Sequence, residues 1–270
     1  MSSPWIFLCP SSRGIGHALT RRLLLTTSLP ILATSRRDPS STKSSLLADL
    51  PSASDLAPRL SIVNLDVTDE SSVQAAAARA RELFPAKTHH LGLACAIPGI
   101  LHPEKNPKQI DYDKALDQFR VNTLGPLLLI KHFSEFLPKT TAEISASPAD
   151  DEVRLPQRGT WLSMSARVGS ISDNRAGGWY SYRASKTAVS SISKSFDNFL
   201  QARSGDKALA VGYHPGTVKT DLSKGFWDSV PQDKLFTPDD AAAKMVDVIK
   251  GLELSQRGKC WDYKNEEVPP

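Results

Sequence analysis

The stretch Trp5-Ile-Phe-Leu-Cys-Pro-Ser-Ser-Arg-Gly-Ile-Gly16 decides the fold that we expect for this chain. Residues 5–9 form a short apolar run, typical of a buried strand, and turn-forming residues follow. From His17 to Leu25 the apolar residues recur with helical spacing. A strand, a glycine turn and a helix in this order can hold a phosphate at the helix N-terminus, although an ordinary strand-to-helix turn has a similar pattern.

The rest of the chain repeats this alternation of strands and helices. We expect further strands at 30–35, 60–65, 91–97, 159–165, 208–213 and 259–262, and helices at 71–84, 113–133, 180–201 and 237–251, with a poorly packed helix within 38–58. The alternation predicts a single α/β domain over residues 1–270, a Rossmann-type doubly wound parallel sheet of about seven strands with helices on both faces. In such a sheet, ligands bind beyond the carboxyl ends of the strands.

The composition is that of an ordinary globular protein, with 40% hydrophobic and 23% charged residues. The net charge of +4 comes without a basic tract, which argues against nucleic-acid binding. Cys9, Cys95 and Cys260 are too far apart for a metal pattern or a disulfide framework. The sequence contains neither an apolar run of membrane-spanning length nor a secretion leader, so we expect no membrane contact and a cytoplasmic location.

A second informative stretch is Gly177-Gly-Trp-Tyr-Ser-Tyr-Arg-Ala-Ser-Lys186. Tyr182 and Lys186 are four residues apart and therefore share one face of a helix. A phenol titrates near pH ~10, and a neighbouring cation lowers that pKa. Tyr182 is therefore a candidate proton donor or acceptor, although the same spacing also occurs on solvated helical faces.

Two further polar features need a partner or a role. Asn122 lies inside an apolar helical stretch, where an amide must at least bond to a nearby carbonyl. Arg36 and Arg37 directly follow the second expected strand. At this position of a dinucleotide site a basic residue accommodates the phosphate of NADP, which we favour for Arg36, whereas Arg37 is equally well explained as a solvated charge.

The ordered set of these features resembles the short-chain dehydrogenase/reductase family over nearly the whole chain. The set comprises the glycine loop, Asp66 after the third strand, Asn122, Ser165 after the fifth strand, the Tyr182/Lys186 pair and Pro215-Gly216. Residues 165–171, 177–183 and 258–262 are most similar to the C-factor or sniffer-like carbonyl reductase branch.

The resemblance implies an NADP(H)-dependent oxidoreductase that transfers a hydride to a ketone or aldehyde, or from a secondary alcohol in reverse. Tyr182 would exchange the proton, and Lys186 would lower the pKa of Tyr182 and bind the nicotinamide ribose. Ser165 would orient the substrate oxygen, with Ser163 as the second choice, and Asn122 would hold a water that links Lys186 to solvent.

The resemblance also assigns the cofactor site and the partners. NADP(H) is favoured over NAD(H), the substrate is a small carbonyl compound or alcohol, and the chain is expected to form a homodimer or homotetramer. Residues 138–158 are expected to be an extended surface loop and residues 221–236 a substrate lid, whose Phe226 and Trp227 either cover an apolar substrate or pack onto the core. The cofactor residues are Ser11, Ser12, Arg13, Gly14, Ile15, Gly16, Arg36, Asp66, Val67, Gly99, Tyr182, Lys186, Pro215, Gly216, Val218 and Thr220.

The chain departs from the family pattern at three places. Cys9-Pro10 replaces Thr-Gly in the glycine loop, and Ala96-Ile97-Pro98 replaces Asn-Asn-Ala before Gly99. Ala166 takes the position of the usual catalytic hydroxyl. These changes keep a second hypothesis open, a cofactor-binding regulatory or scaffold protein with little or no turnover. An NAD-dependent alcohol-oxidising enzyme is a third hypothesis, which Arg36 disfavours.

Overall fold

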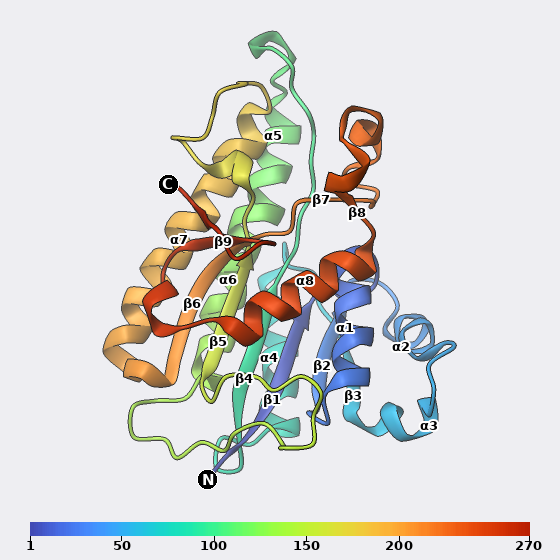
Figure 1. Cartoon of the computed structure of the whole chain (residues 1–270), viewed down its shortest axis with the longest axis vertical. Helices are drawn as coiled ribbons and strands as arrows, with labels where there is room; N and C mark the ends of the chain where they lie inside the picture. Colours follow the sequence, from blue (N-terminus) through green and yellow to red (C-terminus); the bar gives the residue numbers. More distant parts are fainter.

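A computed structural model describes all 270 residues and has one eight-stranded sheet at its centre (Figure 1). The strand order is β10-β9-β6-β5-β4-β1-β2-β3, and every pair except β9 and β10 is parallel. The strands are β1 (Ser3–Cys9), β2 (Ile31–Ser35), β3 (Leu60–Asn64), β4 (His89–Ala96), β5 (Gly159–Met164), β6 (Ala208–His214), β9 (Cys260–Asp262) and β10 (Glu267–Val268).

The seven parallel strands confirm the predicted strand positions to within two residues. The eighth, β10, was not predicted, because a two-residue strand is too short to show an alternating pattern. The chain reverses at Asn265, which has a φ of 61°, and Glu267 then pairs with Trp261 of β9. The antiparallel β10 extends the sheet at this edge without changing the doubly wound fold.

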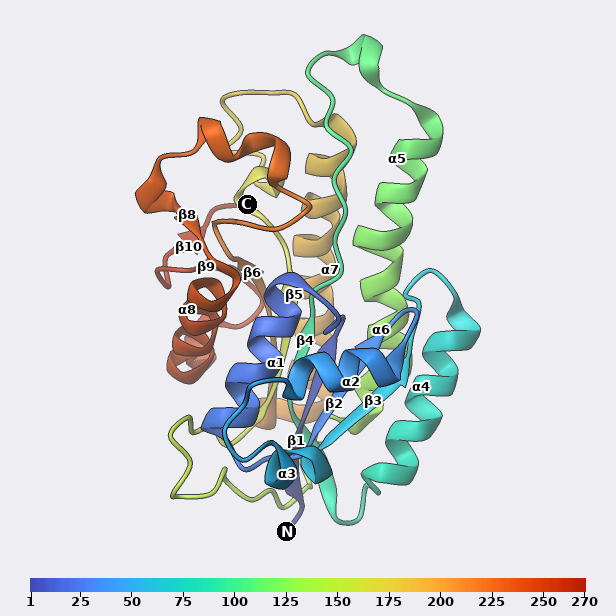
Figure 2. The ribbon, with the colours of Figure 1, turned by 90° about the vertical axis from the view of Figure 1, so that its right-hand side faces the viewer.

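Helices cover both faces of the sheet, as predicted; Figure 2 shows α1 and α8 on one side and α4, α5 and α6 on the other. Ile6 and Leu8 of β1 belong to the core cluster that also contains residues of α1 and α8. Trp5 and Phe7 belong to the opposite cluster, together with residues of α4, α6 and α7. Successive side chains of the strand thus lie on opposite faces of the sheet and belong to two separate cores. The helices are α1 (Gly14–Thr26), α2 (Pro39–Leu47), α3 (Ala53–Leu56), α4 (Glu70–Leu83), α5 (Tyr112–Phe119), α6 (Gly125–Phe133), α7 (Tyr180–Ser204) and α8 (Pro238–Gly251).

The single helix predicted at 113–133 is interrupted in its middle. Between α5 and α6 lies a π-helical turn, η3 (Arg120–Leu124), which contains the buried Asn122. Pro126 follows it at the start of α6 and has no N–H to donate to the carbonyl of Asn122. π-Helical turns of this kind are frequent at functional sites, and Asn122 lies inside this one.

The long loops lie at opposite ends of the sheet (Figure 1). Residues 138–158, at the end nearest the N-terminus, contain no helix or strand, but Val153 and Leu155 are buried in the core beneath α1 and α8. At the other end, residues 221–236 form two short 3-10 turns and β8 (Leu235–Phe236), which pairs with β7 (Thr217–Val218). None of the helices combines the length and the apolar character that crossing a bilayer requires. The predicted homodimer or homotetramer stays a prediction.

Candidate functional site

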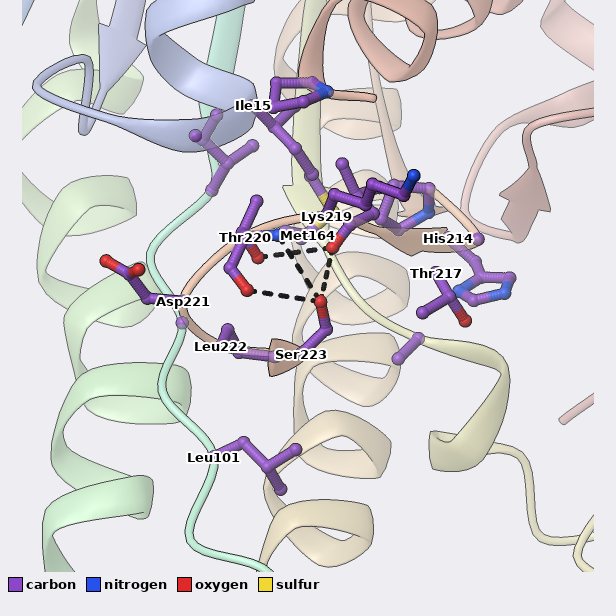
Figure 3. Close-up of a pocket in the computed structure, with 18 of the residues that line it drawn as sticks. Ile15, Leu101, Met164, His214, Thr217, Lys219, Thr220, Asp221, Leu222 and Ser223 are labelled. Carbon is purple, nitrogen blue, oxygen red and sulfur yellow. Dashed lines mark hydrogen bonds between the residues drawn. The ribbon is translucent and has the colours of Figure 1, made fainter. Parts of the chain in front are cut away.

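A cavity of about 600 Å³ opens at the carboxyl ends of the strands, where the fold predicts a ligand site. Its walls come from the glycine loop after β1, the loops after β4, β5 and β6, the start of α7 and the segment 221–236. Figure 3 shows Ile15 of the glycine loop and Leu101 of the β4 loop at opposite ends of the view, with Thr220 between them. Segments far apart in sequence therefore meet at one site.

The structure brings most of the predicted site residues together in this cavity. The predicted residues that line it are Arg13, Gly14, Ile15, Gly16, Gly99, Ser165, Tyr182, Lys186, Pro215, Gly216, Val218 and Thr220. The predicted residues that do not line it are Ser11, Ser12, Arg36, Asp66, Val67 and Asn122.

The altered glycine loop keeps the close backbone packing that a phosphate cradle requires. A Cβ added at Gly16 would lie 1.9 Å from the carbonyl oxygen of Pro10, so only glycine fits there. A Cβ at Gly14 would lie 3.3 Å from Cγ2 of Thr220, which brings the glycine loop against the loop after β6. Replacement of Thr-Gly by Cys9-Pro10 has therefore not opened the loop.

Ser11 has a different role from the one predicted. Its N–H donates to the carbonyl of Thr34 at 2.9 Å, and its hydroxyl donates to the carbonyl of Leu8 at 3.3 Å. Both polar groups are thus used inside the protein, and the side chain is fully buried. Ser11 shapes the loop and offers no free group to a ligand.

The other predicted residues outside the cavity follow the neighbouring strands β1, β2 and β3. Ser12 and Arg36 are exposed, and the structure shows no hydrogen bond of the Arg36 guanidinium. Asp66 Oδ1 accepts hydrogen bonds from the N–H and the hydroxyl of Thr68, at 2.9 and 2.7 Å. Because the ends of β1, β2 and β3 are adjacent in the sheet, these residues lie along the same sheet edge, outside the cavity, and their cofactor role stays a prediction. Val67 lies nearby against Gly125, where an added Cβ would be 2.9 Å from it.

Tyr182 and Lys186 form a buried pair on the first turns of α7. The Lys186 ammonium lies 5.7 Å from the centre of the Tyr182 ring and donates to the carbonyl of Met164 at 2.9 Å. Burial lowers the pKa of Lys186 to about 8. Burial also raises the pKa of Tyr182, so in this arrangement the effect of burial exceeds the predicted lowering by Lys186. The phenol is consequently neutral near pH 7 and holds a proton to donate.

Asn122 meets Lys186 around Gly99, although it does not reach the cavity itself. A Cβ added at Gly99 would lie 3.7 Å from Lys186 Nζ and 4.0 Å from Asn122 Oδ1. The amide of Asn122 accepts from the N–H of Ile100 at 2.9 Å and donates to its carbonyl at 3.0 Å. A third bond, of 3.0 Å, joins Asn122 to the hydroxyl of Ser185 on α7. Asn122 is therefore a positioning residue that fixes the β4 loop against α7.

The catalytic serine stays a prediction, and the structure shows what the two candidate hydroxyls contact. Ser165 lies at the cavity wall, but its hydroxyl donates to the carbonyl of Lys186 at 3.1 Å and pairs with Ser190 at 2.9 Å. Ser163, the second choice, is buried outside the cavity and accepts from the indole N–H of Trp161 at 3.2 Å. The Ser165 hydroxyl therefore donates within the protein and the Ser163 hydroxyl lies outside the cavity, while Ala166 lines the cavity without a hydroxyl.

Sequence reasoning missed an aromatic pair at the substrate end of the cavity. Trp179 and Phe226 both line the cavity, with ring centres 4.8 Å apart. Trp227, the other predicted lid aromatic, does not line it, and its indole N–H donates to the hydroxyl of Ser223 at 2.8 Å. The only sequence signal for Trp179 was the Gly177-Gly178 pair before it, which indicates an unusual backbone.

Comparisons with known proteins agree with the fold, although no protein family profile matches the sequence. The chain is 32% identical over 195 residues to a 1-hydroxy-2-glutathionyl-2-methyl-3-butene dehydrogenase of Rhodococcus sp. (strain AD45), covering 72% of this chain and 74% of that protein. It is 30% identical over 160 residues to C-signal of Myxococcus xanthus, covering 59% of this chain and 81% of that protein.

The fold is similar to that of an NADPH-bound carbonyl reductase from chicken fatty liver, with a TM-score of 0.80, 25% identity and full coverage of both chains. The mostly parallel sheet agrees with the fold of this structure. The chain belongs to the short-chain dehydrogenase/reductase family.

Proposed function

We propose that this protein is an NADP(H)-dependent oxidoreductase that reduces a ketone or aldehyde, or oxidises a secondary alcohol in reverse. The observation that carries the proposal is the buried Tyr182/Lys186 pair in a cavity that the glycine loop and the loop 215–220 also line. The similarity to a carbonyl reductase that binds NADPH supports both the reaction and the cofactor.

The residues present fit this cofactor. The N-terminus of α1, with Gly14 and Gly16 in its first turn, would hold the pyrophosphate. The exposed Arg36 would bind the additional phosphate of NADP(H), since no acidic residue replaces it at the end of β2. Asp66 and Thr220 would bind the adenine amino group and the nicotinamide carboxamide. When bound, NADPH supplies the hydride.

The protein itself supplies the proton and holds it in position. The neutral phenol of Tyr182 donates its proton to the carbonyl oxygen of the substrate. The ammonium of Lys186, held by the carbonyl of Met164, favours the phenolate that this transfer leaves behind. Because the Ser165 hydroxyl donates within the protein and Ser163 lies outside the cavity, Tyr182 also orients the substrate oxygen in this proposal.

The change Tyr182→Phe tests the reaction. We expect turnover of carbonyl compounds with NADPH to fall about 10²–10⁴-fold, the usual contribution of a positioned general acid, while NADPH binding is retained. Fluorescence titration measures the binding. Tyr180→Phe is the matched control, because Tyr180 is exposed and does not line the cavity. Unchanged turnover in Tyr182→Phe would refute the assignment.

The change Arg36→Ala tests the cofactor preference. We expect weaker NADPH binding and unchanged NADH binding, because the guanidinium is proposed to contact only the phosphate that distinguishes the two. Arg37→Ala, the adjacent exposed charge, is the control. An unchanged ratio of the two affinities in Arg36→Ala would favour the NAD-dependent hypothesis.

The occupied serine hydroxyls also favour a second candidate, a cofactor-binding regulatory protein with little turnover. This candidate predicts NADPH binding without reduction of any compound in a broad carbonyl panel. Measurable NADPH oxidation that depends on both a carbonyl compound and Tyr182 would exclude it.

A further inference from the structure

The backbone before α7 takes an unusual path. Gly177, Gly178 and Trp179 are three consecutive residues with positive φ, at 63°, 66° and 48°. Glycine adopts this left-handed region freely, but a bulky residue such as tryptophan does so only at a cost. A strained residue at a ligand cavity indicates that the position of its side chain serves a function.

Hydrogen bonds on both sides hold Trp179 in this conformation. Its N–H donates to the carbonyl of Glu104 at 2.6 Å, and its carbonyl accepts from the N–H of Arg183 at 2.8 Å. Glu104 is itself buried, and its carboxylate accepts from both the N–H and the hydroxyl of Ser181. The Arg183 side chain donates to the carbonyl of Gly178 at 3.0 Å. The turn is therefore fixed by the β4 loop and by α7 together.

This turn places the indole between the proton donor and the lid. The Trp179 ring centre lies 6.0 Å from that of Tyr182, with the planes at 79°, and 4.8 Å from that of Phe226, with the planes at 58°. Leu101, Ala166, Val168 and Val230 add apolar side chains to the cavity lining, and Ser223 and Ser229 add hydroxyls beside Phe226 in sequence. The charged lining residues other than Lys186 are Arg13, Lys219 and Asp221, which lie in the glycine loop and the loop after β6.

We propose that Trp179 and Phe226 form an aromatic clamp, in which the two rings pack against each other and a substrate ring packs against this pair, not between its members. The clamp selects an uncharged carbonyl compound with an aromatic ring directly next to its carbonyl group. Aromatic rings attract one another in tilted and offset arrangements, so a flat ring gains more from this clamp than a puckered aliphatic ring. The short separation between Trp179 and Tyr182 places the bound ring beside the phenol, and hence the carbonyl next to that ring.

This inference rests on the proposed reductase function. In the reaction the carbonyl carbon forms a C–H bond with the hydride from NADPH, and the carbonyl oxygen forms an O–H bond with the proton from Tyr182. The C=O π bond breaks, the products are a benzylic alcohol and NADP⁺, and Tyr182 is reprotonated from solvent.

The test compares acetophenone with cyclohexyl methyl ketone, which has the same number of carbon atoms but a puckered ring. We expect the wild-type kcat/KM to be about tenfold higher for acetophenone. In Trp179→Leu this preference should fall to near unity, because the loss of the ring lowers kcat/KM for acetophenone more than for cyclohexyl methyl ketone. Tyr180→Leu is the matched control, because Tyr180 is the adjacent aromatic residue and is 40% exposed.

A second variant separates loss of the ring from damage to the fold. Trp179→Asn removes the indole, but asparagine tolerates the left-handed conformation, so α7 should keep its start. Thermal unfolding checks both variants. We expect the preference for acetophenone to disappear in Trp179→Asn with the melting temperature retained; a preference that persists in this variant would overturn the clamp.

Binding provides a readout that does not depend on turnover. Calorimetric titration of acetophenone into protein saturated with NADP⁺ should give an affinity about tenfold higher than in Trp179→Asn. Equal affinities for acetophenone and cyclohexyl methyl ketone in the wild-type protein would overturn the clamp, even if both are reduced. Selective acetophenone binding without reduction would retain the clamp and refute the reductase function instead.

Discussion

The two walls of the cavity differ in how firmly the fold holds them. The buried wall consists of Ser165, Tyr182 and Lys186, with Asn122 directly behind it, and none of these four residues is more than 7% exposed. The exposed wall consists of Arg13 and the segment 221–236, joined by an ion pair between Arg13 and Asp221 whose side chains are 71% and 80% exposed. The residues proposed for proton transfer are thus part of the core, whereas the residues at the cavity mouth lie on loops.

We infer from this difference that the buried wall carries the proton transfer and the exposed wall adapts to the ligand. Rigid elements hold groups whose geometry decides a proton transfer, and loops adapt more freely to ligands. Substitutions in the buried wall should therefore affect stability, turnover or both, and those in the exposed wall should affect mainly binding. Single substitutions in each wall can test this difference.

The largest effect is expected for Lys186→Met, which removes the cation beside the buried phenol while keeping an unbranched side chain. Turnover should fall about 10²–10⁴-fold, because the phenolate formed on proton transfer loses its stabilising charge. Steady-state kinetics measure this, with Lys194→Met, an exposed lysine of the same helix, as the control. A loss smaller than tenfold would mean that the buried wall does not need its cation.

The pH dependence of turnover also tests the need for the Lys186 charge. Below its pKa of about 8, Lys186 is charged, and above it the ammonium loses its proton. The rate of carbonyl reduction should therefore be level below pH 8 and fall about tenfold per unit above it. In Lys186→Arg the residual rate should show no such fall near pH 8, because arginine stays charged. A wild-type rate that rises between pH 8 and 9 would contradict this role.

The sequence predicted those parts of the buried wall that depend on local spacing. Tyr182 and Lys186 are four residues apart on one helix, and the glycine loop follows an apolar strand directly, so local pattern placed both. The seven parallel strands were predicted for the same reason. The doubly wound order then brings their carboxyl ends to one edge, whatever the details of packing.

The sequence could not predict features set by contacts between distant segments. The hydroxyl of Ser165 bonds to α7, and this depends on how the end of β5 packs against that helix. The pairing of Trp179 with Phe226 likewise joins the start of α7 to the lid. Such contacts between distant segments leave no periodic pattern in the sequence. They nevertheless decide which groups line the cavity.

Asn122→Ala should produce the next largest effect, this time on folding. The change leaves the N–H and the carbonyl of Ile100 without their partner in a half-buried loop. It also removes the hydrogen bond that joins Asn122 to the hydroxyl of Ser185. We expect the free energy of unfolding to fall by about 2–3 kcal/mol. Chemical denaturation measures this. Thr123→Val, which removes one bond to the carbonyl of Ser185, should cost only about 1 kcal/mol.

Ser165→Ala probes a residue of the buried wall that we place outside the chemistry. Its hydroxyl holds β5 to α7, so its loss should cost about 1 kcal/mol of unfolding free energy and leave turnover within about threefold of wild type. A drop in kcat of about 10²-fold with unchanged stability would restore Ser165 as a catalytic residue, since that is the range of a positioned catalytic group.

Asp221→Asn, in the exposed wall, should have the smallest effect. Exposed ion pairs contribute little, so the free energy of unfolding should change by no more than ~0.5 kcal/mol. Arg13, which lines the cavity beside the glycine loop, loses its carboxylate partner and becomes free for the cofactor phosphates. NADPH affinity should therefore rise by roughly twofold to fivefold at low salt, and the gain should shrink as salt screens the charges. Asp228→Asn, another exposed acid of the same segment, is the control. If Asp221→Asn instead weakens NADPH binding or destabilises the fold, the Arg13–Asp221 pair holds the site together, and the division between a fixed wall and an adaptable wall fails at the mouth of the cavity.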